Sequence, residues 1–147
     1  MIVQILLGSA MIILTTVIQG GFTVAAVEML RRRITRKVAR SNFHTTLMLS
    51  CFVLWLFVAT ILEVWAWAAL YLLIGAAQSI EEAAYFSTVT FTTLGYGDIT
   101  LDEQWRLLSS FEGANGLLMF GWSTALIFAA VQRVYEFERK LPRQSSK

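Results

Sequence analysis

Long stretches of the chain carry no charged side chain. Asp, Glu, Lys and Arg are absent from residues 1–27, 41–62, 64–80, 83–97 and 113–132. A helix needs about 20 predominantly apolar residues to cross the hydrocarbon core of a bilayer, and several of these runs approach or exceed that length. Only 15% of the residues are charged, whereas a soluble domain carries about 25%. The pattern predicts a membrane protein and excludes a soluble enzyme domain, a nucleic-acid binder and a disordered chain.

The runs predict an all-α membrane protein with three transmembrane helices, at about residues 3–28, 44–74 and 105–135. A short helix is expected at about 80–91, because Ser79 and Glu82 have the capping-box spacing at its start. Gly95 and Gly97 then interrupt the helical pattern. Irregular backbone at membrane depth is tolerated only where protein buries it or where it lines a water-filled cavity. We therefore expect a re-entrant hairpin between the second and third spans.

The distribution of basic residues predicts the orientation. Residues 31–40 hold six of the twelve Lys and Arg residues, and the tail from Arg133 holds five, whereas the connection between the second and third spans holds only Arg106. Cytoplasmic loops carry an excess of Lys and Arg. The 31–40 connection and the C-terminus are therefore predicted to be cytoplasmic, and the N-terminus and the 75–104 loop to lie outside the cell membrane. An aromatic belt is expected at the outer end of the second span, at Trp65, Trp67 and Tyr71.

The basic cluster comprises Arg31, Arg32, Arg33, Arg36, Lys37 and Arg40. Topology alone explains its position, and contact with anionic lipid headgroups is an additional expectation. A voltage sensor is disfavoured, because sensor arginines lie within an apolar span rather than in a connection. His44, the only histidine, is expected at the inner interface, where a pH-sensing role is the less favoured interpretation. Cys51 is the single cysteine, so an intrachain disulfide is impossible.

Residues 92–98 read Thr-Thr-Leu-Gly-Tyr-Gly-Asp and are named here the signature segment. The segment resembles the selectivity-filter signature of potassium channels, and the resemblance extends over residues 44–135. It implies an ion-binding set made of Thr93, Leu94, Gly95, Tyr96 and Gly97, with potassium held by the backbone carbonyls of the first four. Rings of carbonyls can replace the hydration shell of an ion. Aiming successive carbonyls at one axis requires alternating backbone handedness, which glycine adopts without steric cost.

The resemblance also implies residues that support the signature segment. Tyr96 should point away from the pore axis and pack on the short helix near Tyr85 and Phe86. Asp98 should accept a hydrogen bond from the Tyr85 hydroxyl. Thr92 belongs to the same supporting set.

The third span contains candidate gating and cavity residues. Gly116 and Gly121 are candidate hinge positions by the resemblance, and close helix packing by small residues is an equally weighted interpretation. Phe120 and Thr124 are candidate cavity-lining residues. A one-residue change in register would place Gly121 and Ala125 there instead.

Two acidic residues, Glu63 and Glu112, fall within predicted spans, where ionisable groups are costly and usually functional. Structural groups with partners, such as Arg106 or a hydroxyl of the short helix, are favoured over direct ion contact. The outer loop is also acidic: residues 81–106 hold five acids against one arginine. This rim either concentrates cations or is simply solvated, and both interpretations stay open.

The expected organisation is a peripheral N-terminal helix (1–30), a basic cytoplasmic connection (31–43), a pore domain (44–135) and a short cytoplasmic tail (136–147). One chain supplies one filter strand, so a homotetramer with fourfold symmetry is expected. The resulting hypothesis is a potassium-selective channel subunit that is not an enzyme and holds no cofactor other than potassium ions. The alternatives are a weakly selective cation channel, against which Tyr96 argues, a potassium-uptake transporter subunit, and a non-conducting scaffold or accessory subunit.

Overall fold

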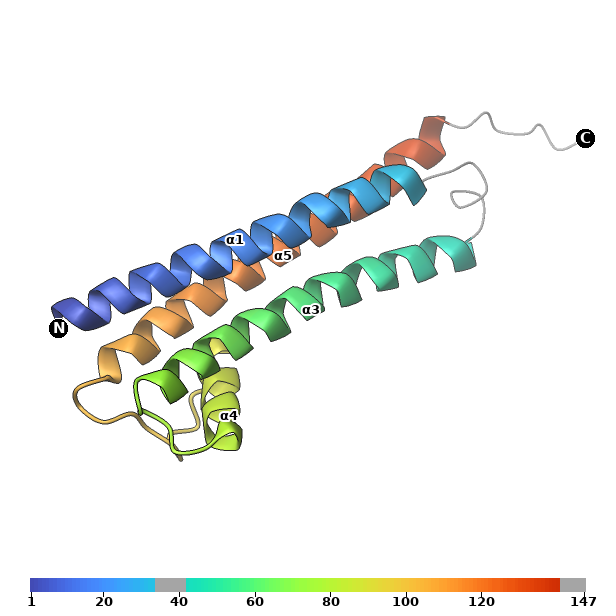
Figure 1. Ribbon diagram of the computed structural model, residues 1–147. Coiled ribbons are helices and arrows are strands. Elements are labelled where there is room, and N and C mark those ends of the chain that lie inside the picture. Colours follow the sequence, from blue (N-terminus) through green and yellow to red (C-terminus); the bar gives the residue numbers. More distant parts are fainter. Residues whose placement is uncertain (34–41, 141–147) are drawn as a thin grey trace, which may run out of the picture.

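The computed structural model describes residues 1–33 and 42–140, and every regular element in this part of the chain is a helix (Figure 1). The helices are α1 (Ile2–Arg33), α3 (Asn42–Leu73), α4 (Ile80–Phe91) and α5 (Arg106–Lys140). Three of them, α1, α3 and α5, are long and apolar enough to cross a membrane. The all-helical class, the three spans and the short helix at 80–91 are therefore confirmed.

Two helices extend beyond the predicted spans. α1 continues to Arg33, and its last turns carry a Glu28–Arg32 pair with 2.6 Å between Oε1 and Nε. Such i,i+4 pairs stabilise a helix in water. α5 continues to Lys140 through a polar stretch of good helix formers. The end of an apolar run predicts where a helix leaves the hydrocarbon core, but α1 and α5 both continue beyond that point. The basic residues at 36, 37 and 40 and the tail from 141 lie outside the described residues.

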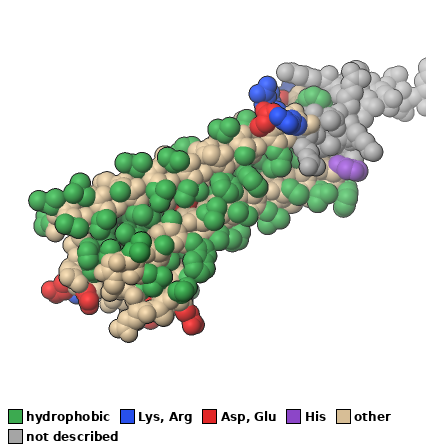
Figure 2. Space-filling view, viewed as in Figure 1, with side chains coloured by type: hydrophobic (Ala, Val, Ile, Leu, Met, Phe, Trp, Pro, Cys, Tyr) green, Lys and Arg blue, Asp and Glu red, His purple; other side chains and the backbone are tan. Residues whose placement is uncertain are grey.

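The three long helices run side by side, and α4 lies at the end where α1 begins and α3 ends (Figure 1). One apolar cluster joins α4 to the long helices and includes Trp67, Tyr71, Phe86, Phe91 and Leu108. A second cluster near the opposite end includes Ala26, Leu30, Phe52, Leu56 and Ala130. Apolar side chains cover the face shown in Figure 2, and its charged side chains lie at the two ends. This distribution is typical of a bundle that crosses a bilayer.

The expected aromatic belt is only partly present. Trp65 is 49% exposed, but Trp67 and Tyr71 are both fully buried. These two side chains belong to the core beside α4 rather than to the membrane interface. The prediction was wrong for them because a belt and a core stripe cannot be told apart from the residue types alone.

α1 is attached to α5 by polar contacts within the apolar bundle, a set named here the polar ladder. Its hydrogen bonds run from Leu107 N to Gln4 Oε1 (3.1 Å), from Asn115 Nδ2 to Thr15 Oγ1 (2.9 Å) and from Gln19 Nε2 to Ser123 Oγ (2.8 Å). Gln4, Thr15 and Gln19 are buried. Gly8 adds a close approach, because a Cβ built there would lie 2.7 Å from the Phe111 ring. Side-chain hydrogen bonds and small residues are the usual means of joining helices in a membrane.

Candidate functional site

The start of α4 is fixed by its cap. Ser79 is extended (φ −141°, ψ 159°), and its Oγ accepts a hydrogen bond from the Glu82 N–H at 3.1 Å. The Glu82 carboxylate accepts in return from the N–H of Gln78 at 2.9 Å, one residue before the position of an ideal capping box. Glu81 and Glu82 also place negative charge at the positive end of the helix dipole. The predicted N-cap at Ser79 is thus present and sets where α4 begins, whereas the return bond of Glu82 goes to Gln78 instead of Ser79.

The end of α4 binds the backbone of the signature segment. The hydrogen bonds run from Thr93 N to Thr90 O (2.9 Å), from Leu94 N to Val89 O (3.0 Å) and from Gly95 N to Val89 O (3.3 Å). In a trans peptide the carbonyl points opposite to the N–H of the same unit. The carbonyls of Thr92, Thr93 and Leu94 therefore point away from the α4 end.

The signature segment alternates in backbone handedness. Positive φ angles occur at Thr93 (61°), Gly95 (54°) and Gly97 (78°), with Leu94 and Tyr96 between them outside that region. Thr93 is the one non-glycine residue with positive φ among those that the structure describes. A β-branched residue in this region is a genuine outlier that costs about 1–3 kcal/mol. Such strain concentrates at functional sites, because the surrounding structure must enforce it.

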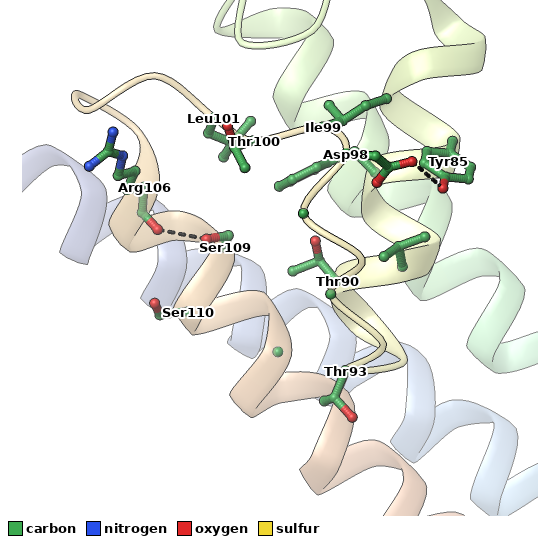
Figure 3. A pocket seen from close by; sticks show the side chains of 15 residues that line it. Tyr85, Thr90, Thr93, Asp98, Ile99, Thr100, Leu101, Arg106, Ser109 and Ser110 are labelled. Carbon is green, nitrogen blue, oxygen red and sulfur yellow. Dashed lines mark hydrogen bonds between the residues drawn. The ribbon is translucent and has the colours of Figure 1, made fainter.

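A hydrogen bond ties the far end of the signature segment back to α4. The Tyr85 hydroxyl donates to Asp98 Oδ2 at 2.6 Å (Figure 3), so the structure contains the bond that the resemblance implied. This bond is the main reason why the pKa of Asp98 lies below its usual 3.8 and the pKa of Tyr85 lies above its usual 10.0. Asp98 therefore lies beside the second turn of α4, and the signature segment runs back along α4.

A cavity of about 530 Å³ separates the signature segment and α4 from the first turns of α5 (Figure 3). Tyr85, Thr90, Thr93 and Asp98 line one side, and Arg106, Ser109 and Ser110 line the other. Within a single subunit, the segment is therefore supported from α4 and not from α5.

Two large side chains of the signature segment are uncovered. Leu94 is 58% exposed and Tyr96 is 67% exposed. Phe86 packs instead against Tyr71 of α3, with ring centroids 5.2 Å apart. The expected packing of Tyr96 on the short helix remains a prediction for an assembled form.

Behind the signature segment, the Glu112 carboxyl group joins three helices, an arrangement named here the Glu112 network. Tyr71 of α3 donates its hydroxyl to Oε2 at 2.6 Å, and the Ser87 Oγ of α4 lies 2.5 Å from Oε1. The same Ser87 Oγ lies 2.8 Å from the Val64 carbonyl oxygen. Tyr71, Ser87 and Glu112 are fully buried. Of the two expected partners of Glu112, the hydroxyl of the short helix is present as Ser87. The other, Arg106, pairs instead with Glu103 in the loop.

Glu63 departs from the expectation that it has a partner. Its side chain is fully buried, and neither carboxyl oxygen has a hydrogen-bond partner among the described residues. Nothing in the sequence separated this residue from Glu112. Whether a buried glutamate has a hydrogen-bond partner depends on which polar groups of the neighbouring helices lie at the same depth in the bundle.

The small residues of α5 are not equivalent. A Cβ at Gly116 would overlap the Phe91 carbonyl oxygen at the end of α4, whereas Gly121 has nothing within 4 Å. The packing interpretation is thus supported for Gly116, and α5 is continuous through both glycines. Phe120 is 36% exposed, and its ring centroid is 5.9 Å from that of Phe91. Thr124 is exposed, and the hinge and cavity-lining roles remain predictions.

The comparison with protein families gave one result. Residues 50–133 match a family model described as an ion channel. Searches of curated proteins and of solved structures found no match. The matched range begins within α3, contains α4 and the signature segment, and ends within α5. Because the match covers more than half of the 147 residues, the chain belongs to the ion channel family.

Proposed function

We propose that the protein is the subunit of a potassium-selective channel, which lets potassium pass down its electrochemical gradient. The observation that carries the proposal is the backbone of the signature segment. Positive φ at every second residue from 93 to 97, together with N–H groups bound to the end of α4, supports a row of carbonyl oxygens on the free side. Carbonyl rings of this kind replace the hydration shell of potassium.

A homotetramer with fourfold symmetry completes the site, because each chain contributes only one such strand. The exposure of Leu94 and Tyr96 in the single subunit supports this, since large apolar groups at a site of this kind need cover. In the assembly, Thr93, Leu94, Gly95 and Tyr96 contribute the potassium-binding carbonyls. Tyr85, Thr92 and Asp98 support them.

We also propose that α4 and the signature segment form a re-entrant hairpin. The end of α4 meets α5 at Gly116, ten residues after Arg106. Ten residues of helix rise about 15 Å, roughly half of the 30 Å hydrocarbon core. At this depth the negative end of the α4 dipole favours a cation below the filter.

The proposed orientation has the N-terminus outside the cell membrane and the C-terminus in the cytoplasm. The supporting observation is that Arg31 and Arg32 lie at the end of the bundle opposite to α4. An excess of Lys and Arg marks the cytoplasmic side. Residues 44–135 then form the pore domain, with α1 outside it.

The test is potassium uptake into liposomes that contain the purified protein, with a proton ionophore to balance charge. Three proteins are compared: wild type, Gly95→Ala and the matched control Gly75→Ala. Gly75 lies in the loop before α4 and has a φ of +69°, close to the +54° of Gly95. A Cβ thus imposes similar backbone strain at both positions, but only Gly95 lies in the signature segment.

Wild type and Gly75→Ala should show barium-sensitive uptake that a sodium gradient does not support, and Gly95→Ala should show none while staying tetrameric. Equal uptake of sodium and potassium would favour the weakly selective channel. A silent wild-type tetramer would favour the non-conducting scaffold. Normal potassium uptake by Gly95→Ala would refute the filter assignment.

A further inference from the structure

The position of α4 decides where the signature segment lies, because both ends of the segment are hydrogen-bonded to this helix. At one end, the carbonyls of Val89 and Thr90 accept from the backbone N–H groups of residues 93–95. At the other end, the Tyr85 hydroxyl donates to Asp98 (Figure 3). A cavity separates the segment from α5. A displacement of α4 relative to the long helices therefore displaces the signature segment with it.

Ser87 lies between these two attachments. It is two residues after Tyr85 and two residues before Val89, so the three lie within about one turn of α4. The Ser87 side chain is fully buried, and its Oγ lies 2.8 Å from the Val64 carbonyl oxygen of α3 and 2.5 Å from Glu112 Oε1 of α5. Among the described residues, it is the one side chain of α4 that is hydrogen-bonded to either of these helices.

The other contacts of α4 with the long helices do not fix its position in the same way. Phe86 packs against the ring of Tyr71, and the Phe91 carbonyl lies close to Gly116. Apolar contacts are non-directional, so they tolerate sliding and rotation, whereas a hydrogen bond requires a set distance and angle. A satisfied network of buried hydrogen bonds also makes its surroundings rigid. The bonds of Ser87 are therefore the contacts that fix α4 along and around its axis.

This position matters for ion selection. A carbonyl ring selects potassium by the number and the spacing of the oxygens that replace the hydration shell of the ion. Sodium is the smaller ion, so a ring whose oxygens can move inward discriminates less against sodium. Groups at such a site need to be held within about 0.5 Å by the residues behind them. Because α4 supports the signature segment within one subunit, holding α4 in place holds the carbonyls in place.

We propose that Ser87 is a positioning residue that determines potassium selectivity. Its hydroxyl, held by α3 and by Glu112 of α5, fixes α4 between the two attachments of the signature segment. The inference rests on the proposed function and goes beyond it, since it assigns part of the selectivity to buried groups that touch no ion. Loss of the Ser87 hydroxyl then relaxes the spacing of the carbonyls while the pore still conducts.

The test is the ratio of potassium to sodium permeability, measured from the reversal potential of the full-length protein in planar bilayers. Only tetramers isolated by size-exclusion chromatography are used. Ser87→Ala removes the hydroxyl with both of its contacts. The matched control is Thr88→Ala, which removes a hydroxyl from the next residue of α4. Thr88 is exposed, and its Oγ1 donates within α4 to the Ala84 carbonyl at 2.7 Å.

Ser87→Ala should conduct, but with a permeability ratio lowered by about twofold or more, the factor that corresponds to loss of a weak hydrogen bond. Thr88→Ala should keep the wild-type ratio. Glu112→Gln should keep it as well, because its amide can donate to Ser87. A wild-type ratio in Ser87→Ala would overturn the proposal even if the thermal midpoint fell, because the role of Ser87 would then be merely structural. An equal fall in Thr88→Ala would also overturn it.

Two further outcomes are distinguishable. If Ser87→Ala gives no tetramer, the decision passes to Glu112→Leu/Tyr71→Phe, which removes the α5 partner of Ser87 together with the hydroxyl that would be left unpaired. A lowered ratio in that variant would support the proposal, and a wild-type ratio would overturn it. A wild-type protein without potassium selectivity would refute the proposed function and this inference together. A selective wild type with an equally selective Ser87→Ala would refute this inference alone.

Discussion

Replacement of Glu112 by Gln should preserve the Glu112 network, whereas replacement by Leu should break it. The network has three oxygen–oxygen contacts: Tyr71 with Glu112, Ser87 with Glu112, and Ser87 with the Val64 carbonyl. Each contact needs one proton, and the two hydroxyls supply only two. A carboxyl group completes the set when it carries the third proton. The amide of Gln supplies it at any pH, because its N–H₂ donates to Ser87 while its oxygen accepts from Tyr71.

The cost of Leu follows from the groups that it leaves behind. The Tyr71 hydroxyl is fully buried, so loss of its acceptor costs about 1–3 kcal/mol, and the lost contact with Ser87 costs about 0.5–1.5 kcal/mol more. The sum is about 1.5–4.5 kcal/mol per subunit. Neither cost applies to Gln. Adding Tyr71→Phe to Glu112→Leu should recover part of the loss, because it removes the unsatisfied hydroxyl.

The measurement is the thermal midpoint of the detergent-solubilised protein, followed by size-exclusion chromatography. A loss of 1 kcal/mol lowers the midpoint by about 2–4 °C for a chain of this size. Leu should therefore lower the midpoint by about 3–18 °C, and Gln by much less. If Gln were as damaging as Leu, the proton count would be wrong, and an ionised carboxylate that accepts from both hydroxyls would replace it.

Two further predictions concern α5 and the signature segment. Gly116→Ala should lower the yield of folded oligomer, because its Cβ would overlap the Phe91 carbonyl oxygen, whereas Gly121→Ala should not; equal yields by size-exclusion chromatography would contradict the close packing. The Tyr85–Asp98 bond should persist between about pH 5 and 9. The pKa of Asp98 is lowered, so the bond is lost on the acid side only as the pH falls through that pKa. The pKa of Tyr85 is raised, so the bond is lost on the alkaline side only as the pH rises through the Tyr85 pKa. Potassium selectivity should thus be constant over this pH range, and it should be lower in the Tyr85→Phe variant. A change of selectivity within the range that disappears in Tyr85→Phe would contradict the persistence of the bond.

Local chemistry made much of the fold predictable. Charge-free runs indicate the spans, and Ser79 and Glu82 mark the start of α4 because capping depends on residues three apart. The positive φ angles of Gly95 and Gly97 were also expected, since glycine signals them. The positive φ of Thr93 was not expected, because a β-branched residue argues against that conformation. It occurs where the backbone is hydrogen-bonded to the end of α4, a contact that the sequence does not reveal.

Contacts between distant segments were the part that sequence could not supply. Thr15 and Gln19 appear in an apolar run as two tolerated polar residues, and nothing local indicates that their partners lie on α5. Tyr71 has the residue type of an interfacial aromatic, yet it is the buried donor to Glu112. In each case the partner is set by how the helices pack, and no short-range pattern encodes that.

The polar ladder has a consequence for biosynthesis, because it joins α1 to α5, which is synthesised much later. Thr15 and Asn115 are 100 residues apart, so at about 5–20 residues per second the first waits about 5–20 s for the second. Meanwhile the Thr15 hydroxyl can bond within its own helix, since it lies 3.0 Å from the Met11 carbonyl oxygen. Gln19 bonds instead across to Ser123. Until α5 inserts, the Gln19 amide therefore lacks the Ser123 partner that its Nε2 has in the folded subunit.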